Sequence, residues 1–200
     1  YSTVAKAMDG KEVIIRTLDI GGDKAIDYLK IDKEEKPFLG FRAIRYCLKN
    51  TELYKKQLRA LLRAAYFGDI KIMLPLVTSL DEVKAAKALI DECAAELESE
   101  GLSFRMAPLG IMIETPSAAL ISDLLAKEVD FFSIGTNDLT GYTMAVDRGN
   151  ANVSHLYDAF QPAVLRAIEM TIKNAKKAGI MVGMCGEAAA DERLIPKLVE

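Results

Sequence analysis

The chain has 200 residues, 50% hydrophobic and 28% charged, a balance typical of a folded globular domain and unlike disordered, collagen-like or coiled-coil chains. Lys and Arg number 26 against 29 Asp and Glu, so the formal net charge of −3 leaves no basic field for nucleic acid or anionic lipid. No apolar run reaches the roughly 20 residues of a membrane span, and residues 1–6 lack a signal-peptide layout. We therefore expect a cytoplasmic protein without membrane insertion, and its three dispersed cysteines indicate reduced thiols.

Five short apolar runs are the main structural signal. Each has the length of a strand, and their nearly continuous apolarity favours a parallel sheet that is covered on both faces. The runs are Val13–Leu18, Ile70–Val77, Leu109–Ile113, Phe131–Ile134 and Ile180–Met184.

Helix signals lie between these runs. Ser79 and Glu82 have capping-box spacing, and apolar residues at steps of three and four follow until Gly101. Other helices are predicted to open at Thr51, at Pro116 and at Pro162, the last one ending at Gly179. The repeated strand and helix pattern predicts an α/β fold of one domain over residues 1–200. Two architectures remain open: a doubly wound open sheet, or part of a (β/α)₈ barrel, which usually needs about 250 residues.

Polar residues follow several of the runs. In parallel α/β folds the carboxyl ends of the strands share one face, so these side chains are expected to converge. Glu114 and Asp138 suit Mg²⁺, which proteins usually hold with one or two carboxylates plus substrate oxygens and water. Arg16, Arg42 and Arg148 suit a substrate that carries phosphate and carboxylate groups. This combination is typical of phosphoryl transfer.

Simpler readings compete with each of these roles. Glu114 fits a structural ion pair, Asn137 with Asp138 fits a helix cap, and Arg42 with Arg45 fits the solvated face of a helix. Cys185 fits either a buried apolar side chain or a reactive thiol. No nucleotide-triphosphate or dinucleotide loop motif is present.

Six motifs, taken together and in order, resemble one family: enzyme I, the phosphoenolpyruvate (PEP)-protein phosphotransferases of the bacterial sugar phosphotransferase system, in their C-terminal PEP-binding domain. The motifs are Arg16-Thr17-Leu18-Asp19-Ile20-Gly21-Gly22-Asp23-Lys24, Gly40-Phe41-Arg42-Ala43-Ile44-Arg45, Ile113-Glu114-Thr115-Pro116, Phe132-Ser133-Ile134-Gly135-Thr136-Asn137-Asp138-Leu139-Thr140, Ala145-Val146-Asp147-Arg148-Gly149-Asn150 and Gly183-Met184-Cys185-Gly186-Glu187.

The resemblance implies a partial (β/α)₈ TIM-type barrel of about five βα units, of the PEP/pyruvate-binding type. It implies a homodimer, Mg²⁺ as cofactor, and PEP and pyruvate as substrate and product. The implied roles of single residues are substrate binding by Arg16, Arg42, Asn137, Asp138 and Arg148, metal binding by Glu114 and Asp138, and protonation of the enolate of pyruvate by Cys185. The enzyme would pass its phosphoryl group to its own histidine and then to the carrier protein HPr.

Two departures from the family pattern qualify this expectation. The family usually has glutamine where this chain has Gly141. The N-terminal phosphohistidine and carrier-binding domain, the first two barrel strands and the last strand are not in these 200 residues, and His155 lacks the family's phosphohistidine context. The 200 residues alone are therefore expected to be inactive. The alternatives are the PEP/pyruvate barrel of a pyruvate phosphate dikinase or PEP synthase, and a truncated module that only binds or assembles.

Overall fold

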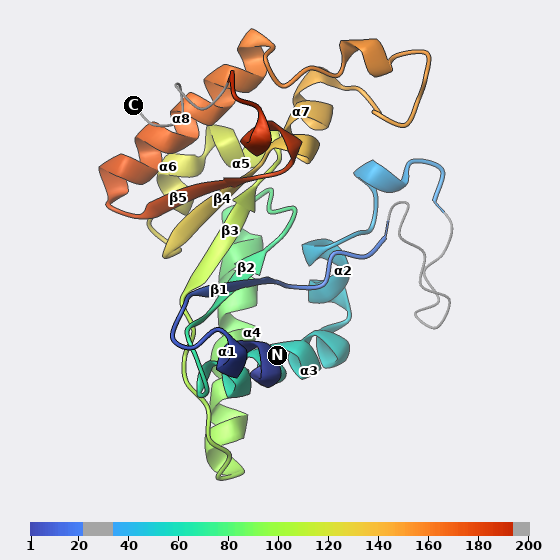
Figure 1. Cartoon of the computed structure of the whole chain (residues 1–200). Helices are drawn as coiled ribbons and strands as arrows, with labels where there is room; N and C mark the ends of the chain where they lie inside the picture. The colour runs from blue at the N-terminus through green and yellow to red at the C-terminus, as the bar shows by residue number, and fades with distance from the viewer. Residues whose placement is uncertain (22–33, 194–200) are drawn as a thin grey trace. The chain divides into compact units, whose positions relative to one another are not determined.

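The computed structural model describes residues 1–21 and 34–193, which divide into two compact units. The first unit comprises residues 1–75 and 81–109, and the second comprises residues 76–80 and 110–200. Figure 1 traces the chain through them. Residues 22–24 of the first motif fall outside the described part, as does a further helix that the sequence predicts over residues 194–200.

All five predicted strands are present, and the paired strands run parallel. They are β1 (Val13–Arg16), β2 (Ile70–Leu74), β3 (Leu109–Ile113), β4 (Phe131–Gly135) and β5 (Met181–Cys185). Their order is β1-β2-β3-β4-β5, so each strand follows its predecessor in sequence. A doubly wound sheet reverses direction at a switch point, whereas a barrel adds every strand on the same side. The consecutive order therefore identifies a partial barrel and excludes the doubly wound alternative.

In the first unit, β1 and β2 pair in register from Val13 with Ile70 to Arg16 with Met73. The helices of this unit are α1 (Ser2–Ala7), the short η2 (Pro37–Leu39), α2 (Ile44–Lys49), α3 (Thr51–Ala65) and α4 (Leu80–Ser99), whose first residue belongs to the second unit. Helix α3 begins at Thr51, and α4 begins directly after Ser79, as their start signals predicted. Tyr54, Leu58 and Leu61 of α3 are fully buried and form part of the core.

In the second unit, β3, whose first residue belongs to the first unit, β4 and β5 are joined by helices. These are α5 (Pro116–Leu120), α6 (Ser122–Leu125), α7 (Thr136–Met144), η3 (Ser154–Leu156), α8 (Pro162–Ala178) and η4 (Glu187–Ala190). Figure 1 shows α8 beside α5 and α6, which it contacts. Gly179 ends α8 with φ +73°, a left-handed conformation that glycine adopts without steric cost. The helix predicted from Pro116 is interrupted at Ile121, so it forms two short helices.

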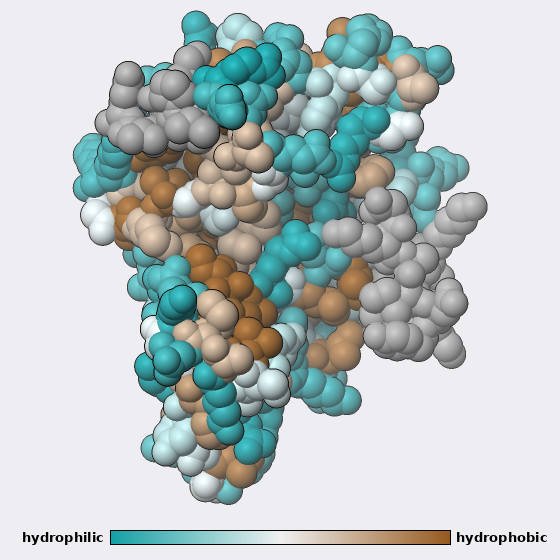
Figure 2. All heavy atoms as spheres, in the orientation of Figure 1, coloured by the Kyte–Doolittle hydropathy of each residue, from teal (hydrophilic) through white to brown (hydrophobic). Residues whose placement is uncertain are grey.

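The burial of the strands differs between the middle of the sheet and its ends. Every residue of β3 and β4 is buried, as their continuous apolarity predicted. On the end strands, Ile14 of β1 is 39% exposed and Met181 of β5 is 45% exposed. Figure 2 shows hydrophobic residues reaching the surface of the viewed face. Apolar side chains of β1 and β5 are therefore left more exposed than those of β3 and β4.

We expect Phe132→Ala to lower the free energy of unfolding by about 3–5 kcal/mol, because the Phe132 ring of β4 is fully buried and its removal leaves a cavity. Phe67→Ala is the matched control, since the Phe67 side chain is 44% exposed. Denaturant unfolding of both variants measures the difference. Equal losses would contradict the placement of β4 in the centre of the core.

Candidate functional site

Glu114 occupies an unusual position for a carboxylate. It follows the last residue of β3 and is only 2% exposed. Its Oε1 atom accepts a hydrogen bond of 2.6 Å from the backbone N–H of Leu76. A buried carboxylate is costly unless its charge is compensated, and the N–H of Leu76 contributes to that compensation. Glu114 thus places a buried acidic group directly after a strand.

Leu76 has a strained backbone that serves this contact. Its φ of +54° is left-handed, which is uncommon for a residue other than glycine, while its side chain is 2% exposed. Such outliers cost about 1–3 kcal/mol and concentrate at functional sites. Nearby, Thr115 donates to the carbonyl of Val77 at 2.8 Å and caps α5 by accepting from the N–H of Ala118. The segment after β2 is therefore tied to the end of β3 at both Glu114 and Thr115.

Gly135, the last residue of β4, packs directly against Glu114. A Cβ atom placed on Gly135 would lie 2.8 Å from both Cβ and Oε2 of Glu114. Helix α7 begins at the next residue, so Asn137 and Asp138 lie in its first turn, where backbone N–H groups give a positive potential. The cap of α7 is Gly135 without a side-chain bond, so the helix-cap reading of Asn137 and Asp138 is wrong.

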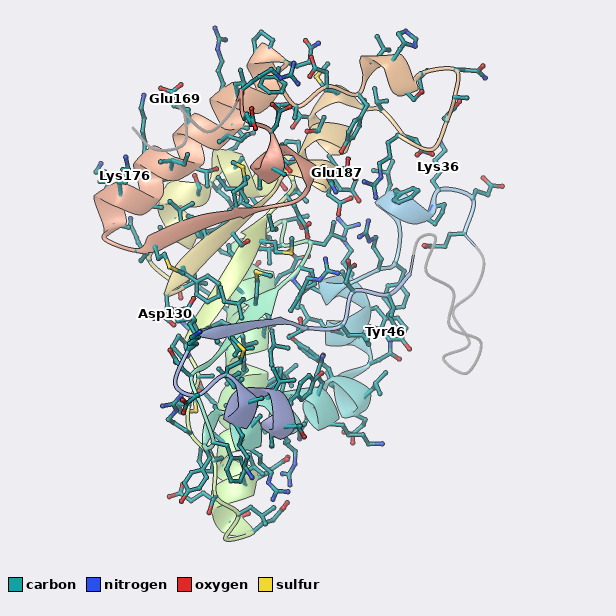
Figure 3. All side chains as sticks on the ribbon, viewed as in Figure 1. Lys36, Tyr46, Asp130, Glu169, Lys176 and Glu187 are labelled. Atoms are coloured by element: carbon teal, nitrogen blue, oxygen red, sulfur yellow. The ribbon has the colours of Figure 1, made fainter. Side chains whose placement is uncertain are left out.

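Asn137 joins the start of α7 to the segment after β5. Its side-chain oxygen accepts the N–H of Glu187 at 3.2 Å, and its carbonyl accepts the hydroxyl of Tyr157 at 2.9 Å. Arg148 lies 3.5 Å from Glu187 in an ion pair whose side chains are 58% and 80% exposed. Glu187 is labelled in Figure 3. More than half of the Arg148 side chain is therefore exposed to solvent although it is paired with Glu187.

Tyr157 stands among these charges. Burial raises the pKa of its hydroxyl; the Arg148 charge opposes this rise, whereas the Glu187 and Asp138 carboxylates add to it. The hydroxyl consequently remains protonated and keeps donating to Asn137. Sequence reasoning did not find Tyr157, because a lone tyrosine in an irregular loop carries no periodic or motif signal.

Cys185 ends β5 and is half-buried, so it is not the fully buried apolar residue of the simpler reading. Its sulfur accepts a hydrogen bond from the Ser133 hydroxyl at 3.4 Å and lies 3.6 Å from the carbonyl of Ile134, to which the thiol donates. Thr136 donates to the Cys185 carbonyl at 3.1 Å. The thiol is thus held at the same end of the sheet as the first turn of α7.

The first unit carries a separate group of charges after β1. Asp19 lies 3.2 Å from Nη1 of Arg16 and 3.1 Å from Nη2 of Arg42. Arg42 precedes α2, which starts at Ile44, and its side chain is 5% exposed, so the solvated-helix reading is wrong for Arg42. Arg45 donates instead to the carbonyls of Leu39 and Gly40.

The predicted site residues thus form one group in each unit. Arg16 and Arg42 meet at Asp19 in the first unit. The second unit holds the rest: Glu114, Asn137, Asp138, Arg148 and Cys185 lie at the carboxyl ends of β3, β4 and β5 or in the segments that follow them. Within the described residues, no cluster of three or more His, Cys, Asp or Glu side chains could hold a metal by itself. Two carboxylates fit Mg²⁺, which takes its other ligands from substrate and water.

None of the helices in the described ranges is both long enough and apolar enough to cross a membrane.

Comparison with known proteins relates these groups to a family. Residues 1–200 match the family model described as "PEP-utilising enzyme, PEP-binding domain". A phosphoenolpyruvate-protein phosphotransferase of Priestia megaterium is 54% identical over 200 residues, and one of Bacillus subtilis is 53% identical. Each alignment covers 100% of this chain and 35% of the relative, so the chain spans about a third of their length.

Among solved structures, the citrate synthase SbnG matches 99% of this chain and 76% of its own, with a TM-score of 0.50 and 14% identity. At that identity the likeness concerns the fold alone. The match to the family model extends over the whole sequence, and the chain belongs to the family of PEP-binding domains of PEP-utilising enzymes.

Proposed function

We propose that this chain is the PEP-binding part of a PEP-protein phosphotransferase, with residues 1–200 forming part of its C-terminal barrel domain. The observation that carries the proposal is the burial of Glu114 against the start of α7, in a chain that matches the PEP-binding family throughout. The relatives at 53–54% identity are named phosphotransferases, which favours this activity over that of a dikinase or a synthase.

Glu114 and Asp138 are the side chains that would hold Mg²⁺. Bound there, the ion would offset the negative charge of the phosphoryl group and of the enolate that forms when this group leaves. The position of Glu114 directly after β3 and against Gly135, which precedes α7, supports this role. The first turn of α7 adds backbone donors and the Asn137 amide for the oxygens of the substrate.

Arg16, Arg42 and Arg148 would bind the phosphate and carboxylate of PEP. A guanidinium is planar and always charged, so it matches two oxygens of either group. Arg16 and Arg148 are 41% and 58% exposed, which leaves them accessible to a substrate. The Arg42 side chain is only 5% exposed, so Arg42 would make a supporting contact to the substrate.

Cys185 would act as the acid that completes pyruvate. When the P–O bond of PEP breaks, the phosphoryl group passes to a histidine nitrogen and leaves the enolate of pyruvate. The Cys185 thiol then gives its proton to the enolate carbon, and solvent reprotonates the thiolate. The hydrogen bond from Ser133 supports this step, because it stabilises negative charge on the sulfur.

The accepting histidine would belong to a separate part of the protein, which would pass the phosphoryl group to the carrier protein HPr in the cytoplasm. A homodimer is part of the same proposal. The positions of β1 and β5 at the two ends of the described sheet support further association, since the backbone edges of end strands favour pairing.

Titration calorimetry with PEP tests the proposed function by measuring PEP binding to the full protein that contains this chain. We expect PEP to bind more tightly when Mg²⁺ is present, and we expect Glu114→Gln to weaken this Mg²⁺-dependent binding by about 10- to 100-fold. Glu169→Gln is the matched control, because Glu169, labelled in Figure 3, is an exposed carboxylate of α8. It pairs with Lys173. Folded wild-type protein that gives no heat with PEP would refute the proposed function.

Gly135→Ala tests how the Glu114 carboxylate is held. The added methyl group would lie 2.8 Å from Glu114 Oε2, so the carboxylate must shift, and we expect a loss of about 1–3 kcal/mol in stability together with weaker Mg²⁺ binding. Gly183→Ala in the neighbouring strand is the control, because its methyl group would meet no atom within 4 Å. Thermal unfolding and Mg²⁺ titration compare the two variants, and equal behaviour would refute the contact.

Cys185→Ala should slow pyruvate formation by about 10²- to 10⁴-fold while PEP binding is retained, because a positioned general acid contributes that much to the rate. Cys93→Ala is the control, since Cys93 is a buried thiol of α4 in the first unit. Pyruvate release by the full protein is measured by rapid quench. Unchanged turnover in Cys185→Ala would remove Cys185 from the proposed mechanism.

A further inference from the structure

Asp19 is a buried carboxylate that no substrate-binding role explains. Its side chain is 4% exposed, and its two oxygens face two different arginines. Oδ2 pairs with Nη1 of Arg16 at 3.2 Å, and Oδ1 accepts a hydrogen bond from Nη2 of Arg42 at 3.1 Å. One carboxylate therefore sets the direction of two guanidinium groups, because each must keep a terminal nitrogen on its own oxygen.

The backbone reinforces the same contact. The carbonyl of Ile20 accepts the N–H of Ala43 at 3.0 Å, which ties the residue after Asp19 to the residue after Arg42. Gly21 has φ +99°, and a Cβ atom placed on it would lie 2.7 Å from Cβ of Arg42. Ala43 also has a positive φ, of +50°. The segments that carry Asp19 and Arg42 therefore approach as closely as their backbones allow. This close contact fixes the backbone from which the Arg42 side chain extends.

The two arginines differ in their access to solvent. Arg16 is 41% exposed, whereas Arg42 is 5% exposed. Asp19 holds the Arg16 guanidinium through the ion pair, while 41% of the Arg16 side chain stays exposed to solvent. An ion-pair group with a purely structural role would not need one of its arginines to stay accessible to solvent.

We propose that Asp19 is a positioning residue for the substrate, which aims Arg16 and Arg42 at the anionic groups of PEP without contacting PEP itself. The inference rests on the proposed function, because it assumes that these arginines bind the substrate. The effect acts through orientation: a displacement of about 1 Å at a site of this kind costs up to 10²-fold. An ion pair that only stabilises the fold is the competing explanation.

The test compares Asp19→Asn with Asp191→Asn in the full protein. Asp191 also pairs with an arginine, Arg193, but this pair is more exposed and lies outside the Asp19 group, so Asp191 serves as the control. The dissociation constant of PEP with Mg²⁺ is measured by calorimetry, and thermal unfolding monitors the fold. We expect Asp19→Asn to weaken PEP binding by about 10- to 100-fold and Asp191→Asn to change it less than twofold. If folded Asp19→Asn binds PEP as tightly as the wild type, the inference about Asp19 is overturned but the proposed function stands. If the wild-type protein binds no PEP, the proposed function is refuted as well.

A double-mutant cycle separates positioning from a structural role. If Asp19 acts through Arg42, then Asp19→Asn in an Arg42→Ala background should cost much less than in the wild type. Additive losses would overturn the inference. If Asp19→Asn does not fold, Asp19→Glu decides, because it keeps the charge and moves the carboxylate by one methylene group. We expect folded Asp19→Glu to bind PEP at least fivefold more weakly than the wild type, and equal binding would overturn the inference.

Discussion

Buried carboxylates at the ends of strands are the constraint on which the rest of the candidate site depends. Glu114 after β3 and Asp19 after β1 are each less than 5% exposed, although a carboxylate without compensation is among the most costly groups to bury. The protein compensates them differently. Asp19 pairs with two arginines, whereas Glu114 accepts the backbone N–H of Leu76.

Much of the fold could be predicted from the sequence, because parallel buried strands and their crossover helices have strong signals. Every apolar run became a strand, and the starts at Thr51 and Pro162 and the stop at Gly179 lie where the residue types indicated. Composition could not distinguish a barrel from a doubly wound sheet, since both use the same strand and helix units; the strand order made that distinction. The break at Ile121 was not predicted, because a helix interruption without Pro or Gly leaves little trace in the sequence.

The site was predicted less completely than the fold. The charged residues at strand ends were found, because a carboxylate or arginine after an apolar run is conspicuous. Their supports were not: Tyr157 and Ser133 act through single hydrogen bonds between segments far apart in sequence, and Asp19 gained its meaning only when Arg42 lay beside it. The role of Gly135 could not be predicted from the sequence either, since it depends on the distance between two neighbouring strands. Contacts of this kind depend on tertiary structure, which no local pattern records.

Leu76, with its left-handed backbone, links the core to the candidate site, and this link affects how the protein would lose ligand affinity on heating. Its side chain is buried, and that burial helps to offset a backbone conformation that is unfavourable for leucine. The same residue donates the N–H that fixes Glu114. If warming loosens the packing around this side chain, the backbone relaxes and the donor turns away. Ligand affinity would then decline at temperatures where the sheet is still intact, so thermal inactivation of this domain would begin locally and precede its melting.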